Sequence, residues 1–333
     1  MKKYKAYGIG AALVDTEIKV QDHELAQMNV EKGLMTLVDE TRRRELLDHL
    51  DGHLVKASHA SGGSAGNSMI ATAQFGARTF MSCKVANDAD GDIYIADLEA
   101  AGVDHCLNGD RAAGTTGKCL VLITPDAERS MNTYLGISET LSTEQLDAEA
   151  IAASEYVYLE GYLVTSPTGR AAAIKAREIA ETAGVKTALS FSDPGMVEYF
   201  REGITEMVGE RLDLVFCNED EALGWAQSDN LDVAVETLKK TAECFVITRG
   251  GEGALTYDGR TLTQIPAQKV LAVDTNGAGD MFAGAFLYAI TRGEDFPTAG
   301  RFASLAAGRV VASYGPRLPA AEYAALRREF FGE

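Results

Sequence analysis

The chain has 333 residues and a formal net charge of −18 at pH 7, and 46% of its residues are hydrophobic. This length and composition suit a globular protein with one large core and a smaller attachment. The negative charge argues against nucleic acid and anionic membrane surfaces as partners. No apolar run is long enough to span a bilayer.

Short apolar runs alternate with helical stretches, and this pattern predicts a parallel sheet covered by helices. Strands are expected at residues 4–9, 79–85, 156–159, 187–191, 212–217 and 244–248. Helices are expected at residues 39–50, 65–75, 92–101, 168–182, 196–208, 231–241, 277–290, 298–313 and 320–331.

Two segments, residues 17–37 and 118–135, break this alternation with strand-like stretches of polar alternation. We expect them to form one small sheet that stands off the main domain and serves as a lid over a cleft. The expected core comprises residues 1–15, 39–105 and 136–333, and the expected lid comprises residues 16–38 and 106–135.

The cysteine spacing and the N-terminal residues bear on the cellular compartment in which the protein acts. The five cysteines are odd in number, and no pair has zinc-finger or redox spacing, so a reducing cytoplasm is the simple interpretation. The basic start and the apolar run after it imitate a signal peptide. However, the run ends at Asp15 without a cleavage pattern, so a buried first strand is expected instead.

Residues 274–280 read Asp-Thr-Asn-Gly-Ala-Gly-Asp and precede an apolar stretch of small residues. The start of such a helix has unpaired backbone N–H groups and the positive end of a dipole, so it can hold the oxygens of a transferring phosphoryl group. Asp280 in the same turn can accept a proton from an alcohol. A helix start that can bind an anion, with a base beside it, indicates a kinase that phosphorylates a hydroxyl group. The alternative is a glycine turn with an aspartate that helps to cap the helix.

Residues 59–68 form a second glycine-rich site, which reads His-Ala-Ser-Gly-Gly-Ser-Ala-Gly-Asn-Ser. The adjacent Gly62 and Gly63 permit a tight turn and a close approach of the backbone to a ligand. Asn67 offers both donors and acceptors, which suits a vicinal diol. The alternative is a strand-to-helix turn with Ser61 or Ser64 as the helix N-cap.

Two further polar turns follow expected strands. Asn218 and Glu221 lie on one helix face, where they could hold Mg²⁺ directly or through water, or form a capping box. Residues 248–253, Thr-Arg-Gly-Gly-Glu-Gly, suit either a backbone approach to a nucleotide phosphate or an ordinary β-turn. The chain has no G-x-x-x-x-G-K-[ST] loop, and residues 8–10 lack the third glycine of a dinucleotide fingerprint.

In this order the motifs resemble those of the ribokinase-like (PfkB) family of carbohydrate and nucleoside kinases, over nearly the whole chain. The matching positions are Gly8-Ile9-Gly10…Asp15, Gly62-Gly63…Asn67, Asn218…Glu221, Thr248…Gly250…Gly253 and Asp274…Asp280. The resemblance implies an α/β fold, a three-layer αβα sandwich with a central, mostly parallel sheet and a small β-sheet lid. It also implies ATP and Mg²⁺ as cofactors, K⁺ in many members, and a monomer or homodimer.

The resemblance also assigns roles to residues. Asp280 is expected to be the base, and Gly277, Ala278 and Gly279 to supply the amides of the anion hole. Acceptor binding is assigned to Asp15, Gly62, Gly63, Ser64, Asn67 and Tyr162. ATP binding is assigned to Asn218, Thr248, Gly250, Gly253, Asn276 and Gly279.

Charged groups complete the site that the resemblance implies. Arg129 matches a lid arginine that contacts phosphate. Asn218 and Glu221 would organise Mg²⁺. Asp274, with the backbone near Gly315, resembles a monovalent-cation site.

Within the family the chain is most similar to the adenosine kinase branch, on residues 62–64, Asn276, residues 160–167 and residues 193–196. This branch implies transfer of the γ-phosphate of ATP to the 5′-hydroxyl of adenosine, a step of purine salvage. One departure is Ala11, where the family often has an asparagine. A fructose or ribose kinase, a broader inosine or guanosine kinase, and a purine-binding regulatory protein remain alternatives.

Overall fold

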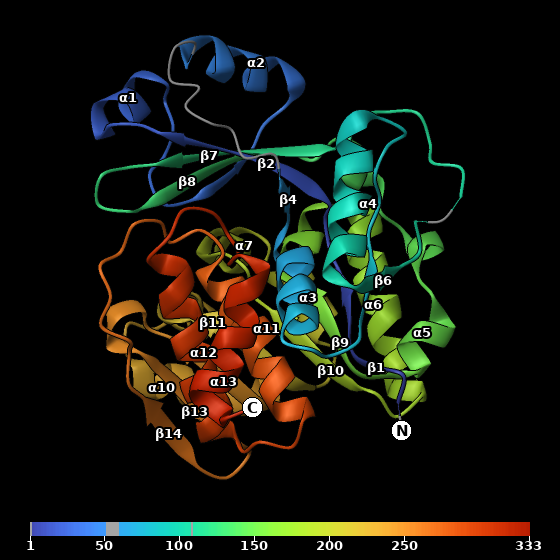
Figure 1. The fold of residues 1–333 in the computed structure, drawn as a ribbon, viewed down its shortest axis with the longest axis vertical. Helices are drawn as coiled ribbons and strands as arrows, with labels where there is room; N and C mark the ends of the chain where they lie inside the picture. The colour runs from blue at the N-terminus through green and yellow to red at the C-terminus, as the bar shows by residue number, and fades with distance from the viewer. Residues whose placement is uncertain (1, 51–59, 108) are drawn as a thin grey trace.

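A nine-stranded sheet forms the centre of the molecule (Figure 1). The computed structural model describes residues 2–50, 60–107 and 109–333. The strand order is β14-β13-β12-β11-β10-β9-β1-β5-β6. The parallel strands are β1 (Tyr4–Ile9), β5 (Thr79–Ser82), β6 (Val103–His105), β9 (Ser154–Glu160), β10 (Lys186–Ser190), β11 (Leu212–Asn218) and β12 (Ala242–Thr248). β13 (Ala254–Tyr257) and β14 (Leu262–Ile265) add an antiparallel edge.

Helices cover both faces of this sheet, because side chains alternate along buried strands. On β9, Tyr156 and Tyr158 enter one hydrophobic core, whereas Val157 and Leu159 enter the other. The first core is covered by α3 (Ser64–Gln74), α4 (Ala89–Ala101), α11 (Ala278–Thr291), α12 (Phe296–Val311) and α13 (Ala320–Phe331). The second is covered by α5 (Ala148–Ala152), α6 (Pro167–Thr182), α7 (Pro194–Tyr199), α8 (Arg201–Val208), α9 (Glu219–Ala226) and α10 (Leu231–Thr241). The predicted three-layer fold is confirmed.

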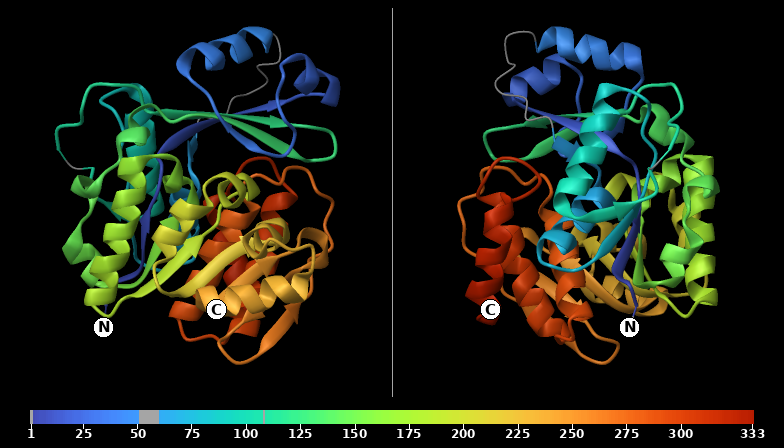
Figure 2. Two further views of the ribbon diagram at one scale, coloured as in Figure 1. Left: turned by 180° about the vertical axis from the view of Figure 1, so that it is seen from behind. Right: turned by 45° about the vertical axis from the view of Figure 1, so that its right-hand side comes forward.

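A five-stranded sheet stands above the central one (Figure 2). Its order is β3-β8-β7-β2-β4, with β2 (Leu13–Lys19), β3 (Met35–Leu37), β4 (Ala60–Gly62), β7 (Gly117–Ile123) and β8 (Arg129–Tyr134). β2 follows β1 after three residues, so the small sheet is joined to the core at the carboxyl ends of the parallel strands. The two separated segments that broke the alternation thus meet in one small sheet.

The helix expected at residues 39–50 packs on the small sheet, not on the core to which the sequence assigned it. α1 (Asp22–Gln27) and α2 (Glu40–His49) cover its outer side. Leu46 and Leu50 lie in one cluster with Ile18 and Leu120 of the small sheet. We propose a boundary that counts α2 with the small sheet; residues 51–59 and 108, also included in the expected division, lie outside those described.

The helix expected over residues 196–208 is two helices. α7 ends at Tyr199 and α8 begins at Arg201, because Phe200 between them has φ −121° and ψ 24°, outside the helical range. The strand expected at 79–85 ends at Ser82. None of the described helices has the length and apolarity that crossing a membrane requires.

Candidate active site

One cavity, of about 490 Å³, is lined by residues of both sheets. Asp15, Cys119 and Arg129 come from the small sheet, and Glu160, Ser190 and Asn218 come from the carboxyl-terminal ends of central strands. This edge is where open α/β sheets bind their ligands. All the residues assigned to the site from the sequence line the cavity, except Gly62 and Asp274.

The start of α11 forms one wall of the cavity. Its N-cap is Gly277, with φ 72°, where a Cβ would overlap the backbone of Pro316, so only glycine fits. The first bond within the helix runs from Met281 N to Gly277 O, which leaves the N–H groups of Gly279 and Asp280 without a partner inside the helix. Ala278 N donates to Thr275 O at 3.3 Å. The N–H groups that are available to an anion are therefore centred on Gly279, which is open to solvent.

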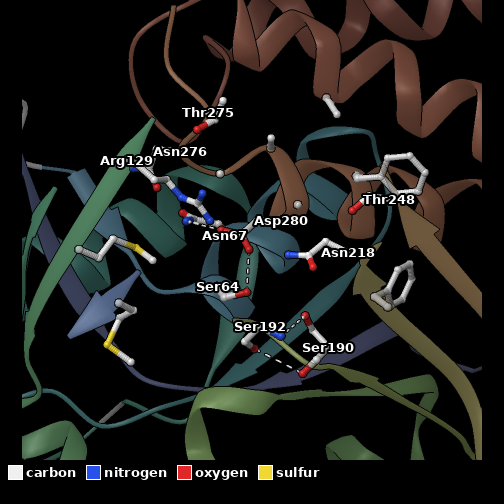
Figure 3. A pocket seen from close by; sticks show the side chains of 18 of the residues that line it. Ser64, Asn67, Arg129, Ser190, Ser192, Asn218, Thr248, Thr275, Asn276 and Asp280 are labelled. Atoms are coloured by element: carbon white, nitrogen blue, oxygen red, sulfur yellow. Dashed lines mark hydrogen bonds between the residues drawn. The ribbon is translucent and has the colours of Figure 1, made fainter. Parts of the chain in front are cut away.

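Asp280 points into the cavity and is held from α3 (Figure 3). Ser64 Oγ donates to its Oδ1 at 2.6 Å, and Asn67 Nδ2 donates to its Oδ2 at 3.0 Å. Burial raises the pKa of Asp280, and these two hydrogen bonds oppose the rise. The Asp280 carboxylate is thus hydrogen-bonded to side chains of α3 and caps no backbone N–H of α11, which disfavours the capping interpretation.

Asn67 presents one free polar atom to the site. Its side chain is 4% exposed, and its Oδ1 has no hydrogen-bond partner within the described part of the chain. A buried oxygen without a partner is costly unless a ligand or water satisfies it. Asn67 therefore holds Asp280 with its amide nitrogen and leaves its oxygen available to a ligand or water. Neither Ser61 nor Ser64 caps α3, whose N-cap is Gly63.

Asp15 lies beside the glycine pair. A Cβ on Gly62 would overlap the Asp15 carboxylate, and one on Gly63 would overlap Ala11 O. Gly62 thus makes room for Asp15 and does not itself line the cavity. Burial and the charge of Glu17 raise the pKa of Asp15 to about 7, so the carboxyl titrates near neutral pH.

Glu160 is a residue of this wall to which the sequence motifs assign no role. It is buried at the end of β9 and accepts hydrogen bonds from Ala65 N at 2.8 Å and Ala11 N at 3.1 Å. Burial raises its pKa to about 7. The signal in the sequence is an acidic residue at the end of an otherwise apolar strand.

Asn218 and Glu221 form the capping box that their spacing allowed. Asn218 Oδ1 accepts from Glu221 N at 2.7 Å, and Glu221 Oε2 accepts from Asn218 N at 3.0 Å. Burial raises the pKa of Glu221 to about 8. The described residues contain no cluster of three or more acidic, histidine or cysteine side chains that could hold a metal ion. The donors fit an ion held mainly by nucleotide phosphates and water, which is how Mg²⁺ is usually bound.

The opposite wall is made mostly of backbone and small side chains. A Cβ placed on Gly250 or Gly251 would have no atom beyond the adjacent residues within 4 Å, so the turn is open to a ligand. Gly253 has φ 89° and packs against Ile265 O, so it shapes the turn. Residues not assigned from the sequence also line this side, namely Ala267, Gln268, Val270, Ser304, Ala307, Gly308 and Val311. Most of these are small or polar, a weak signal in a chain with many such positions.

Arg129 and Asn276 lie where the cavity meets the small sheet. Arg129 of β8 lines the cavity, and its side chain has no ion pair or hydrogen bond among the described residues; Figure 3 shows it directed toward Asn67 and Asp280. Its charge lowers the pKa of Asp280, although burial outweighs it. Asn276 Nδ2 donates to Glu17 of β2 at 3.3 Å.

Asp274 is fully buried and outside the cavity. Its carboxylate accepts from Asn276 N at 2.8 Å and from Gly315 N at 2.9 Å. These bonds hold the turn that precedes α11. Its role at a monovalent cation stays a prediction.

Tyr162 lines the cavity on the acceptor side and donates to Ser192 O at 3.1 Å. Thr248 lies across the cavity at the end of β12 (Figure 3). The structure therefore brings both expected halves of the site, acceptor and nucleotide, to Asp280.

Comparison with known proteins agrees with this architecture. The family model described as pfkB family carbohydrate kinase matches residues 33–322. Adenosine kinase from Schizophyllum commune is 29% identical over 331 residues, covering 89% of this chain and 91% of its own. The solved adenosine kinase from Sinorhizobium meliloti has a TM-score of 0.92 and 34% identity, covering 98% and 99% of the two chains.

A probable sugar kinase from Rhizobium etli is similar to the same degree. Its structure has a TM-score of 0.90 and 33% identity, covering 98% of this chain and 100% of its own. Members of the family transfer a phosphoryl group to a hydroxyl group of a small molecule and use ATP. The chain belongs to the pfkB family of carbohydrate kinases and is a phosphotransferase that acts on a hydroxyl group.

Proposed function

We propose that the protein transfers the γ-phosphate of ATP to the 5′-hydroxyl of adenosine, forming AMP and ADP. The observation that carries this proposal is the group of apolar and aromatic side chains among those that line the cavity. They are Met35, Leu37, Met131, Leu135 and Tyr162. A flat, largely apolar base can bury its faces against such side chains, whereas a free sugar would leave them without a partner.

The residues of this chain divide the work of the proposed reaction. The oxygen of Asn67 and the carboxylate of Asp15 accept hydrogen bonds from the ribose hydroxyls. Asp280 accepts the proton of the 5′-hydroxyl as the new P–O bond forms, since phosphoryl transfer depends mainly on positioning and charge stabilisation. The start of α11 at Gly279 and the Arg129 guanidinium stabilise the negative charge of the transferring group.

The further expectations follow from the same proposal. Mg²⁺, when bound with the nucleotide, would neutralise phosphate charge near Asn218 and Glu221. The five cysteines are free thiols, which suits a reducing cytoplasm. Phosphorylation of a free nucleoside is a purine salvage reaction.

A sugar kinase is the second candidate, and one observation favours it. Glu160 brings a buried carboxyl to the acceptor side, where it could accept a bond from a sugar hydroxyl. The similarity to a probable sugar kinase agrees with this candidate.

The test is an acceptor panel with purified protein, ATP and Mg²⁺, in which ADP formation is measured with adenosine, inosine, guanosine, ribose and fructose. We expect the highest kcat/KM with adenosine. A higher value with ribose or fructose would assign the protein to sugar phosphorylation. Purine binding without ADP formation from any acceptor would identify a regulatory protein.

A further inference from the structure

Residues 315–317, in the loop between α12 and α13, contact the turn that precedes the anion-binding helix. Gly315 N donates to Asp274 at 2.9 Å. The backbone of Pro316 packs against Gly277, the N-cap of α11, where no Cβ would fit. This loop therefore rests directly on the turn that begins α11.

Arg317 extends from the same loop to the acceptor side. Its Nη2 contacts Asp97 Oδ2 of α4 at 2.5 Å, and the Arg317 side chain is only 12% exposed. Asp97 Oδ2 also accepts hydrogen bonds from Ser61 N, at 3.1 Å, and from Ser61 Oγ. Ser61 belongs to β4 and directly precedes the Gly62-Gly63 turn.

The positive charge of Arg317 and the negative charge of Asp97 stabilise each other. Burial raises the pKa of Asp97, but Arg317 and Ser61 outweigh that effect and lower it, so Asp97 is ionised at neutral pH. Arg317 also opposes the larger effects of burial and Glu17 on the pKa of Asp15. Because the Arg317–Asp97 ion pair is hydrogen-bonded and largely shielded from solvent, it holds the loop of Arg317 and helix α4 in a fixed relative position.

We propose that Arg317 is a positioning residue, which fixes the acceptor turn at Gly62-Gly63 relative to the anion-binding turn at Gly277 through Asp97 and Ser61. The connection reaches the small sheet only at Ser61 of β4, and none of the contacts named above involves β7 or β8. The proposal rests on the proposed function only in that the Gly62-Gly63 turn binds the acceptor. An ion pair that serves stability alone would not distinguish acceptor from nucleotide.

The kinetic test compares Arg317→Met, Arg317→Lys and Asp97→Asn with the wild type, on the acceptor that the wild type turns over fastest. We expect Arg317→Met to lower kcat/KM for the acceptor by about 10- to 100-fold, as a small misplacement of a substrate does. The KM for ATP should stay within about twofold. Arg317→Lys should recover part of the loss, because a lysine can still pair with Asp97.

A matched control is Arg309→Met, which removes an arginine from the exposed pair with Glu329 at 2.9 Å, also in the C-terminal region. We expect wild-type kinetics for it. The double variant Arg317→Met/Asp97→Asn should lose no more than either single variant, because both break one connection. Equal rises in KM for acceptor and ATP, or unchanged kinetics with a lower melting temperature, would overturn the proposal. If Arg317→Met does not fold, Asp97→Asn and Arg317→Lys carry the same test.

Crystal structures without ligands separate this proposal from the proposed function. In Asp97→Asn and Arg317→Met, residues 61–63 should shift relative to Gly277 when compared with the wild type in the same crystal form. An unmoved turn would overturn the positioning role whatever the acceptor is. The acceptor panel on the wild type alone decides the proposed function.

Discussion

The acceptor side and the nucleotide side of the cavity are built by different means. On the side assigned to the acceptor, side chains define the site: Asp15 and Asn67 are buried, and Asp280 accepts hydrogen bonds from Ser64 and Asn67 of α3. On the nucleotide side, space and backbone define it: Gly250, Gly251 and Gly279 have no atom near the position of a Cβ. Under the proposed function, acceptor choice would depend on fixed polar groups, whereas nucleotide binding would depend on open N–H groups and small residues.

The largest effect is expected from Asp280→Asn, which removes the proposed base and its charge but preserves the size of the side chain. Positioned acid–base catalysis contributes about 10²–10⁴-fold in rate, so kcat should fall by at least about 100-fold. ATP affinity and melting temperature should change little. The control is Asp295→Asn, which alters the N-cap of α12 outside the cavity and should leave kcat unchanged. Near-normal turnover by Asp280→Asn would remove Asp280 as the base.

The second effect is expected on the nucleotide side, from Gly279→Val. The position has room for a side chain, so the fold should tolerate it, but the added bulk would occupy the space in front of the helix start. Hydrogen bonds to charged groups contribute about 1.5–3 kcal/mol, so kcat/KM for ATP should fall by roughly 10- to 100-fold. Acceptor binding, measured by calorimetry, should be preserved. If Gly279→Val weakens acceptor binding as strongly as it lowers kcat/KM for ATP, the two sides of the cavity do not act independently.

Asn67→Ala should weaken the binding of the acceptor rather than that of ATP. Losing a buried polar partner costs about 1–3 kcal/mol, and here the loss should fall on the acceptor, because Asn67 Oδ1 has no partner in the described structure and is the atom proposed to accept from the acceptor's hydroxyl group. Dissociation constants for adenosine and for an ATP analogue, measured by calorimetry on the same variant, check this. An equal loss for both ligands, or none, would make Asn67 a turn residue only.

The smallest effect is expected in the pH dependence of stability. Asp15 and Glu160 have pKa values near 7 and Glu221 one of about 8, all raised by burial from ordinary values near 4. Between about pH 4.5 and 8 the folded state therefore binds more protons than the unfolded state, so stability falls as pH rises through this window. The melting temperature of the ligand-free protein should be higher at pH 6 than at pH 8.5, and Glu160→Gln should reduce the difference. A melting temperature that rises toward pH 8.5 would contradict this account of the acceptor side.

Much of the fold could be predicted because it depends on local patterns. Buried parallel strands appear as short apolar runs, so six of the nine strands of the central sheet were predicted, whereas the short β6 and the antiparallel edge strands β13 and β14 were not. The two segments of polar alternation do lie in the small sheet. The packing of α2 could not be predicted. The positions of Leu46 and Leu50 show that one face is buried, but not which sheet covers it.

The site was predictable where a motif is contiguous, as in residues 274–280. The bonds that organise it were not, because they join distant residues. Asn67 and Asp280 are 213 positions apart, and Glu160 bonds to Ala11 from 149 positions away. Arg317 lies in no motif, so only the folded chain shows its contact with Asp97.

The central claim is that Asp280 faces a nucleoside hydroxyl on one side and the nucleotide phosphates on the other. A crystal structure of the protein with adenosine and a non-hydrolysable ATP analogue tests it most directly. We predict the 5′-oxygen of adenosine within hydrogen-bond reach of the Asp280 carboxylate, about 2.6–3.2 Å, with the base against Met131 and Tyr162. Adenosine bound only on the nucleotide side, or with its 5′-hydroxyl turned away from Asp280, would contradict the account.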